Sequence, residues 1–251
     1  MGITAVVITK NEERNINRCL ASLGFCDEII VVDSFSTDST VEVAKNFTDR
    51  VYQVEWRGYV GQKNYGVGMA NFNWILSLDA DEEVSEDLKN EILILLGKNP
   101  SHSAFSVPRK TIHSGQWIKH GGWYPNRLVR LFDKNRGSWV GGSVHEYWDS
   151  QGGVGELKND LIHYSFENIF DQVERNNLYS TLGARALNEK KLQFSIWHLI
   201  FKPIFKFFET YILKCGFLDG YLGFIIAVSA AYSVFLKWAK LWELSKHGEK
   251  S

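Results

Sequence analysis

Two aspartates follow an apolar run of strand length in the first third of the chain. Residues 74–78 read WILSL, and Asp79 and Asp81 come directly after them, one residue apart. Alternate side chains of an extended chain point to the same face, so both carboxylates can face one site. They repel each other unless a cation, a proton or a hydrogen-bond donor lies between them. Because magnesium is usually held by one or two carboxylates and substrate phosphates, the stretch predicts a metal–diphosphate site. The alternative is a solvated acidic turn that starts the next helix.

The segments before these aspartates predict where such a site lies. Residues 3–9, 28–33 and 51–56 are β-branched, apolar runs that read as strands, with helical segments between them. Alternation of strand and helix predicts an α/β fold with a mainly parallel central sheet and right-handed crossovers. Ligands of such sheets bind beyond the carboxyl ends of the strands. Thr9, Glu12 and Asp33 are expected there, beside the two aspartates.

The ends of the first two strands narrow the kind of nucleotide site. Neither G-x-G-x-x-G after the first strand nor G-x-x-x-x-G-K-[ST] occurs, which disfavours a classical dinucleotide site and a P-loop. An aspartate at the end of the second strand can accept hydrogen bonds from a ribose or a base. Asp33 has this position, and its alternative role is to cap the polar turn of residues 34–39.

The pattern changes after Pro100. Residues 85–96 predict an amphipathic helix with Ser85 as its N-cap, and residues 104–109, 127–132, 138–140 and 156–163 then read as strands that extend the sheet in antiparallel fashion. The loop of residues 115–125 is rich in aromatic side chains, which suit sugar faces but pack equally well in a core. A glycine-hinged turn at residues 141–146 delivers His145 and Glu146. Ser165 is a candidate cap for a helix that runs to about residue 188.

Composition excludes some classes of protein. The formal net charge is −1, so the basic excess of a non-specific nucleic-acid binder is absent and no nucleic-acid partner is expected. Cys19, Cys26 and Cys215 form no close ligand pair and predict small core residues in a reducing compartment. The apolar segment of residues 3–9 is too short for a signal peptide. We therefore expect a cytoplasmic protein.

Four motifs now stand in order, and together they resemble a known family. Residues 6–13 (VVITKNEE), 31–40 (VVDSFSTDST), 62–64 (QKN) and 78–82 (LDADE) resemble family 2 glycosyltransferases of the GT-A fold. Residues 144–146 (VHE) and 213–220 (LKCGFLDG) are similar to the lipopolysaccharide inner-core β-glucosyltransferases, which add glucose to a heptose. With these two segments, the resemblance covers nearly the whole chain.

The resemblance implies a nucleotide-sugar donor, most simply UDP-glucose, and a divalent metal, Mn²⁺ or Mg²⁺. An imidazole ligand favours manganese over magnesium. The implied donor and metal residues are Glu12 and Asp33 at uridine, Thr9 lining its pocket, Lys63 near the base or the diphosphate, Asp79 at the ribose or the metal, Asp81 at the metal and His163 as its third ligand. The alternative for His163 is a satisfied core histidine.

The reaction needs a base as well. A sugar hydroxyl attacks poorly until a carboxylate removes its proton, and Glu146 is the candidate, with His145 beside it as orienter or substitute. Many relatives carry an acidic residue followed by Asp where this chain has His-Glu. A single displacement inverts the anomeric carbon and gives a β linkage from an α-linked donor. Arg127 and Arg130 are candidates for phosphate contacts, and surface ion pairing is the alternative.

The tail is the second informative stretch. We predict a catalytic domain over residues 1–195 and a helical membrane-attachment region over residues 196–251. Apolar residues recur at helical spacing from Trp197, with Lys202, Lys206 and Lys214 off that stripe. The charge-free run of residues 220–236 is shorter than the ~20 residues of a membrane span, so a hairpin in the interface fits better. The alternative is a helical pair packed on the domain or on a dimer partner.

These expectations combine into a first hypothesis with several alternatives. The first is an inverting transferase, peripherally attached to the inner face of the bacterial inner membrane, acting on a lipid A-core heptose acceptor. Another membrane-linked or capsular glycan acceptor, or a nucleotide-sugar-binding protein without transferase activity, are the alternatives. A nucleotidyltransferase would need a glycine-rich basic loop after the first strand. A phosphatase with an aspartate nucleophile would carry it after the first strand, not the fourth.

Overall fold

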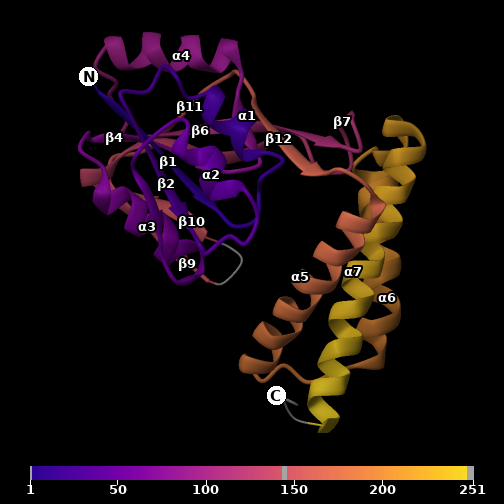
Figure 1. Ribbon diagram of the computed structural model, residues 1–251. Coiled ribbons are helices and arrows are strands. Elements are labelled where there is room, and N and C mark those ends of the chain that lie inside the picture. Colours follow the sequence, from indigo (N-terminus) through magenta and orange to yellow (C-terminus); the bar gives the residue numbers. More distant parts are fainter. Residues whose placement is uncertain (1, 143–145, 248–251) are drawn as a thin grey trace. The chain divides into compact units, whose positions relative to one another are not determined.

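The computed structural model describes residues 2–142 and 146–247. The chain divides into two compact units, each described separately below (Figure 1). Unit 1 comprises Met1–Lys110 and Asn126–Tyr164, and unit 2 comprises Thr111–Pro125 and Ser165–Ser251. The predicted boundary after residue 195 falls inside unit 2, because the long helix that precedes this boundary packs along the last helix of the chain.

A mixed sheet forms the centre of unit 1. Its parallel part has the order β3-β2-β1-β4, and β8, β6, β12 and β5 continue it. The pairs β4–β8, β8–β6 and β12–β5 are antiparallel. The predicted α/β fold with a mainly parallel core and an antiparallel extension is thereby confirmed. The strands are β1 (Ile3–Thr9), β2 (Glu28–Asp33), β3 (Val51–Gln53), β4 (Trp74–Asp79), β5 (Glu82–Val84), β6 (Ala104–His113), β7 (Gln116–Ile118), β8 (Asn126–Asp133), β9 (Gly137–Gly141), β10 (Glu146–Ser150), β11 (Val154–Glu156) and β12 (Leu161–Phe166).

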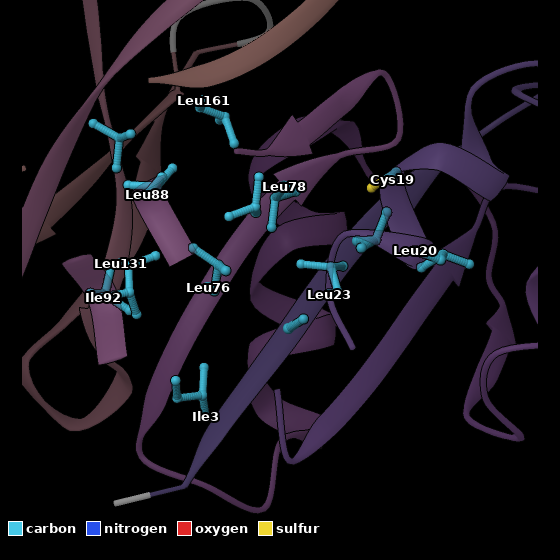
Figure 2. Packing of buried hydrophobic residues seen from close by; sticks show 14 of the residues in the cluster. Ile3, Cys19, Leu20, Leu23, Leu76, Leu78, Leu88, Ile92, Leu131 and Leu161 are labelled. Carbon is cyan, nitrogen blue, oxygen red and sulfur yellow. The ribbon is translucent and has the colours of Figure 1, made fainter. Parts of the chain in front are cut away.

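Helices cover one face of this sheet through a large apolar cluster. The helices are α1 (Ile16–Ala21), α2 (Thr40–Lys45) and α4 (Glu86–Gly97). Leu20 of α1 and Leu88 and Ile92 of α4 are fully buried against alternate residues of the central strands, among them Leu76 and Leu78 (Figure 2). The predicted cap of α4 is confirmed, since the Ser85 hydroxyl accepts a hydrogen bond from Leu88 N–H at 3.2 Å.

The opposite face carries α3 (Gly58–Met69) and the ribbon formed by β9 and β10. Gly66 allows α3 to approach the sheet closely, because a Cβ there would lie 2.4 Å from Val6 Cγ1. In the ribbon, the rings of Trp139 and Trp148 pack on Phe132 of β8, and the Phe132–Trp148 centroids are 3.7 Å apart. A short 3₁₀ turn, η1 (Lys134–Arg136), joins β8 to β9.

Unit 2 contains three long helices and the loop after β6. They are α5 (Ile169–Glu189), α6 (Ile196–Phe208) and α7 (Gly220–His247), with a π-helical turn η2 (Glu209–Leu213) and a 3₁₀ turn η3 (Gly216–Asp219) between the last two. Asn168, not the predicted Ser165, caps α5 by accepting from Asp171 N–H at 3.0 Å. Ser165 cannot do so because it is still part of strand β12. Asn176 of α5 donates to the Ser229 hydroxyl of α7 at 2.6 Å.

The apolar surface of α6 is exposed over its whole length. None of its residues is fully buried, and Trp197 and Phe205 are 67% and 64% exposed. Within the described part of the chain, the helical segment Gly216–Lys246 is long and apolar enough to cross a membrane by length and composition, with 28% of its apolar window buried. This segment is longer than the charge-free run of residues 220–236, because the helix continues past that run through Lys237 and Trp238, and the interfacial hairpin stays a prediction.

The cysteines are free thiols. Cys19 is buried under the sheet, and Cys26 and Cys215 are half-buried. Burial raises the pKa of the Cys19 thiol well above its usual value and that of Cys26 to about 12. Both thiols of unit 1 are therefore held in the unreactive protonated form.

Candidate active site

The carboxyl ends of the three central strands meet at one edge of the sheet. Thr9 pairs in register with Asp33, and Ile8 pairs with Asp79. The loops that follow β1 and β2 bind each other, since Asn11 Oδ1 accepts from Thr37 N–H at 2.8 Å. Asn11 adopts φ 54°, a left-handed conformation that is uncommon outside glycine and that is concentrated at functional sites. The structure thus brings the predicted residues of these strand ends to one place.

Asp33 is fully buried and caps the turn after β2. Its carboxylate accepts hydrogen bonds from Ser36 N–H at 2.9 Å, from the Ser36 hydroxyl and from Gln53 Nε2 at 3.2 Å. This is the alternative role that the sequence left open, and its contact with uridine stays a prediction. Glu12 is half-buried and accepts from Asn15 Nδ2 at 2.8 Å. Its place at uridine also remains a prediction.

Asp79 lies between two cations. Arg130 Nη2 donates to Asp79 Oδ2 at 2.7 Å, and Lys63 Nζ lies 3.3 Å from Asp79 Oδ1. Burial raises the pKa of Asp79, but the charges of Arg130 and Lys63 outweigh that effect and hold it far below its usual value. The carboxylate is therefore ionised at every physiological pH, and its negative charge is already balanced by protein cations.

Glu82 also belongs to the site. It is the last residue of the LDADE motif, but the sequence analysis assigned it no role. It is 1% exposed and accepts from Arg130 Nη2 at 2.6 Å, from Arg109 Nη1 at 3.3 Å and from the backbone N–H of Asp79 at 3.0 Å. Burial lowers the pKa of Arg130, and its two carboxylate partners, Asp79 and Glu82, more than reverse this. Glu82 therefore fixes both the backbone of the aspartate turn and the guanidinium that holds Asp79.

Asp81 and His163 form a separate pair on the other side of the turn. His163 Nε2 lies 3.3 Å from Asp81 Oδ2, and the next backbone N–H, that of Tyr164, donates to the Asp81 carbonyl at 2.9 Å. Strand β12 thus contacts the aspartate turn twice, through the His163 side chain and through the Tyr164 backbone. An oxygen and an imidazole nitrogen at this separation suit a divalent cation with borderline preferences.

Asp79, the third predicted metal ligand, contacts protein cations instead of the Asp81–His163 pair. Across residues 2–142 and 146–247, no group of three or more His, Cys, Asp or Glu side chains is arranged to hold a metal ion. Asp79 directs its carboxylate to Arg130 and Lys63, and a role for it at a metal stays a prediction. The donor set of Asp81 and His163 fits a cation that takes its other ligands from substrate oxygens or water.

Lys63 connects this cluster to the candidate base. The side chain is 1% exposed, and its ammonium donates to Glu146 Oε1 at 2.9 Å. Glu146 is the first residue of β10 and its side chain is 18% exposed, so its carboxylate reaches solvent from the site. The other candidate, His145, lies outside the described residues.

Neighbours of Lys63 on α3 make two further bridges. Gln62 donates to the Ser34 hydroxyl at 2.6 Å, next to the end of β2. Asn64 donates to the carbonyl of Trp139 at 2.9 Å and accepts from its N–H at 3.1 Å, which joins α3 to β9. The QKN motif thus connects the donor side of the site with the ribbon that carries Glu146.

Several buried polar atoms along this edge have no hydrogen-bond partner among the described residues. Such atoms are rare and costly in folded proteins, and a ligand that supplies their partners is a common reason for them. They are Thr9 Oγ1, Gln62 Oε1, Ser77 Oγ, Arg109 Nε and Arg130 Nε. The mixture of acceptors and positively charged donors fits a polar anionic ligand.

The predicted aromatic loop belongs to unit 2, where its rings divide between two roles. Trp123 packs on His113 and Phe166, whereas Trp117 is 45% exposed. His120 is bound through Nδ1 to Asp219 at 2.9 Å, and the Asp219 carboxylate also accepts from its backbone N–H at 2.8 Å. The loop is therefore tied to the turn before α7, and the Trp117 side chain is partly exposed.

Comparisons with known proteins agree with the geometry. The family model described as "Glycosyl transferase family 2" matches residues 4–154. An uncharacterised glycosyltransferase of Rickettsia typhi is 32% identical over 97% of this chain and 87% of its own length. The lipopolysaccharide core biosynthesis glycosyltransferase LpsC of Rhizobium meliloti is 29% identical over 96% of this chain and 92% of its own. The solved structure of S. aureus TarS 1-349 in complex with UDP-GlcNAc has a TM-score of 0.50 at 15% identity, covering 99% of this chain and 93% of that one, and supports the fold alone.

Proposed function

Because this chain belongs to glycosyl transferase family 2, we propose that it is an inverting, metal-dependent hexosyltransferase with a nucleotide-sugar donor. The donor we propose is UDP-glucose, and the acceptor is the heptose of a lipopolysaccharide inner core. The observation that carries the proposal is the edge of the sheet where Asp79 and Glu146 converge on the buried Lys63 and Arg130, with the Asp81–His163 pair beside them at the same turn. The donor, the acceptor and the linkage are our inference from the resemblance of residues 6–13, 31–40, 62–64 and 78–82 to this family and of residues 144–146 and 213–220 to its inner-core glucosyltransferases.

Different residues are proposed to bind the nucleoside, the diphosphate and the metal ion of the donor complex. Thr9, Glu12 and Asp33 stand at the ends of β1 and β2, where a nucleoside fits, and Thr9 Oγ1 has no hydrogen-bond partner among the described residues. Arg130 and Lys63 are positively charged donors beside Asp79, toward the side where a diphosphate would lie. Asp81 and His163 would hold Mn²⁺ or Mg²⁺. A cation bound there neutralises the charge that grows on the departing nucleoside diphosphate.

Glu146 completes the reaction on the acceptor side. An acceptor hydroxyl loses its proton to the Glu146 carboxylate as its oxygen attacks the anomeric carbon. The bond from that carbon to the diphosphate oxygen breaks in the same displacement, so the configuration inverts. The electron pair of the broken bond stays on UDP, and the proton stays on Glu146 until it exchanges with solvent.

The tail supports a membrane-bound acceptor. Exposed contiguous apolar surface marks an interaction site, and α6 exposes Trp197, Phe201 and Phe205 by more than half. Lys202 and Lys206 lie close enough to Lys237 to lower its pKa, after the larger effect of burial. Aromatic and lysine side chains together suit an interface with anionic lipid. We propose that unit 2 attaches the enzyme to the inner face of the inner membrane.

Turnover with a panel of nucleotide sugars and a heptose-containing core acceptor tests the proposal. We expect sugar transfer that requires Mn²⁺ or Mg²⁺ and that falls by about 10²–10⁴-fold in Glu146→Gln, the range for loss of a general base. Asp81→Ala should lose metal dependence together with activity. Nucleotide binding without transfer to any acceptor would favour the alternative, a nucleotide-sugar-binding protein. Metal-dependent UDP release that survives Asp81→Ala would remove Asp81 from the site.

A further inference from the structure

The ammonium group of Lys63 is held on three sides. It donates to Glu146 Oε1 at 2.9 Å, lies 3.3 Å from Asp79 Oδ1, and stands 4.6 Å from the centroid of the Trp139 ring. The side chain is 1% exposed, so water does not replace any of these partners. A buried ammonium is stable only when its charge is compensated, and here two carboxylates and an aromatic face compensate it.

The carboxylate that Lys63 binds is not carried by the main sheet. Glu146 begins β10, which pairs with β9 in a separate two-stranded ribbon, with Glu146 opposite Gly141. Two-stranded ribbons are weakly stable by themselves. This one is fastened to α3, because Asn64 binds both backbone groups of Trp139 and Lys63 binds Glu146. The direction of the Glu146 carboxylate therefore depends on contacts from α3.

We propose that Lys63 is a positioning residue that acts through Glu146. Its ammonium fixes the carboxylate on the donor side of the site, at a set distance from Asp79, so that the base faces the acceptor hydroxyl when the donor is bound. This inference rests on the proposed function and goes beyond it. It differs from the sequence prediction, in which Lys63 itself contacts the nucleotide, either at its uracil ring or at its diphosphate.

Kinetics of three variants separate these two roles. If Lys63 acts through Glu146, then Lys63→Met, Glu146→Gln and the double variant should all lose about 10²–10⁴-fold in kcat, with the double variant no worse than either single one. The donor KM should change by less than about threefold, because only the base is misplaced. If Lys63 instead binds the diphosphate, the donor KM should rise and the two losses should multiply. That outcome overturns the proposal.

Further variants distinguish a folding defect from a misplaced Glu146. Arg50→Met removes an ion pair with Glu28 near the opposite ends of the strands, so it should lower Tm without changing kcat. Lys63→Met leaves Glu146 without its cation and is the variant at risk of misfolding. The double variant removes both charges while Asp79 keeps Arg130. Lys63→Gln retains an amide donor for Glu146 and should recover part of the kcat lost in Lys63→Met.

A structural measurement reads the same proposal without turnover. In a crystal structure of Lys63→Met, the Glu146 carboxylate should move by more than about 1 Å, a displacement that is enough to cost 10²-fold in rate, and in Lys63→Gln it should move less. Asp79 should remain on Arg130. An unmoved Glu146 carboxylate overturns the proposal. A wild-type enzyme that transfers no sugar at all would overturn the proposed function instead, and leaves this structural result standing by itself.

Discussion

The two compact units place their charged and apolar groups in opposite ways. Unit 1 buries charged side chains: Lys63, Arg130 and Glu82 are at most 2% exposed. Lys63 forms an ion pair with Glu146, and Arg130 forms one with Glu82. Unit 2 exposes apolar surface: Phe205 and Tyr221 are 64% and 93% exposed. Buried charge is expensive and exposed aromatic surface is a liability in water, so neither is a feature of folding alone. The first prepares a site for a charged ligand, and the second prepares a surface for an apolar partner.

The largest expected effect is on the buried charges of unit 1. Arg130→Met leaves Glu82 fully buried beside Arg109 alone and removes the closest cation of Asp79. Breaking a buried ion pair from one side costs about 3–5 kcal/mol. Urea denaturation followed by tryptophan fluorescence measures this loss. The matched control is Arg127→Met, whose partially exposed pair with Glu156 at 3.6 Å should contribute less than about 1 kcal/mol. Equal losses for the two variants would contradict the claim that unit 1 depends on its buried charges more than on its exposed ion pairs.

The next effect concerns the apolar surface of unit 2. Phe201→Asp with Phe205→Asp replaces two exposed rings on α6, each worth about 1.5–3 kcal/mol when buried in lipid. We expect at least a 100-fold loss of binding to vesicles that contain anionic lipid, measured by co-sedimentation of the full chain. Ile94→Asp changes a residue of unit 1 that is 60% exposed, and it should leave vesicle binding unchanged. Undiminished binding of the α6 variant would favour a helical pair that packs on protein.

Acid should act on unit 1 through Asp79. Its folded-state pKa is held below the unfolded value, so its ionised form contributes stability that is present above the unfolded pKa of about 3.9 and is lost as pH falls toward the folded pKa. The Asp79→Asn variant should be less stable than the wild type at pH 7, and the difference should shrink below about pH 4. Free energies of unfolding at pH 7, 5 and 3 measure this. A constant difference across that range would show that Asp79 is not paired as described.

The smallest effect is that of a helix cap. The Ser85 hydroxyl accepts from the N–H of Leu88 at the start of α4 at 3.2 Å and donates to the Asp160 carbonyl at 2.7 Å. Ser85→Ala should cost about 1 kcal/mol of stability, and Ser85→Asp should recover only part of it, because a carboxylate accepts from Leu88 N–H but cannot donate to the Asp160 carbonyl. Differential scanning calorimetry compares the three proteins. No loss in Ser85→Ala would mean that the cap contributes nothing to the fold.

Local patterns predicted most of unit 1. The β-branched runs at residues 3–9 and 28–33 became the strands they indicated, and Ser85 capped α4, because neighbouring residues decide such features. Local patterns do not predict contacts between side chains that are far apart in the sequence. Lys63 and Glu146 are 83 residues apart, and their contact exists only because α3 and the β9–β10 ribbon lie on the same face. Their sequence neighbourhoods carry no sign of each other.

The missed features have a common cause. Ser165 matched a cap pattern but stayed in β12, where pairing within the sheet is stronger than a single cap, and Asn168 took that place. Glu82 stands in the recognised motif, yet its burial between Arg109 and Arg130 depends on strands β6 and β8. The charge-free run of residues 220–236 did not show where α7 ends, because the helix continues through Lys237 and Lys240 to His247. In each case tertiary packing decided a feature that the local pattern left open.

Calorimetric titration of UDP into the purified full chain, with and without Mn²⁺, tests the central claim most directly. The account predicts that wild-type protein binds UDP more tightly when Mn²⁺ is present and that Asp81→Ala abolishes this difference while the UDP affinity measured without metal is kept. Equal UDP affinity with and without Mn²⁺ in the wild type, or a metal effect of the same size in Asp81→Ala, would contradict a donor site built on the aspartates at the end of β4.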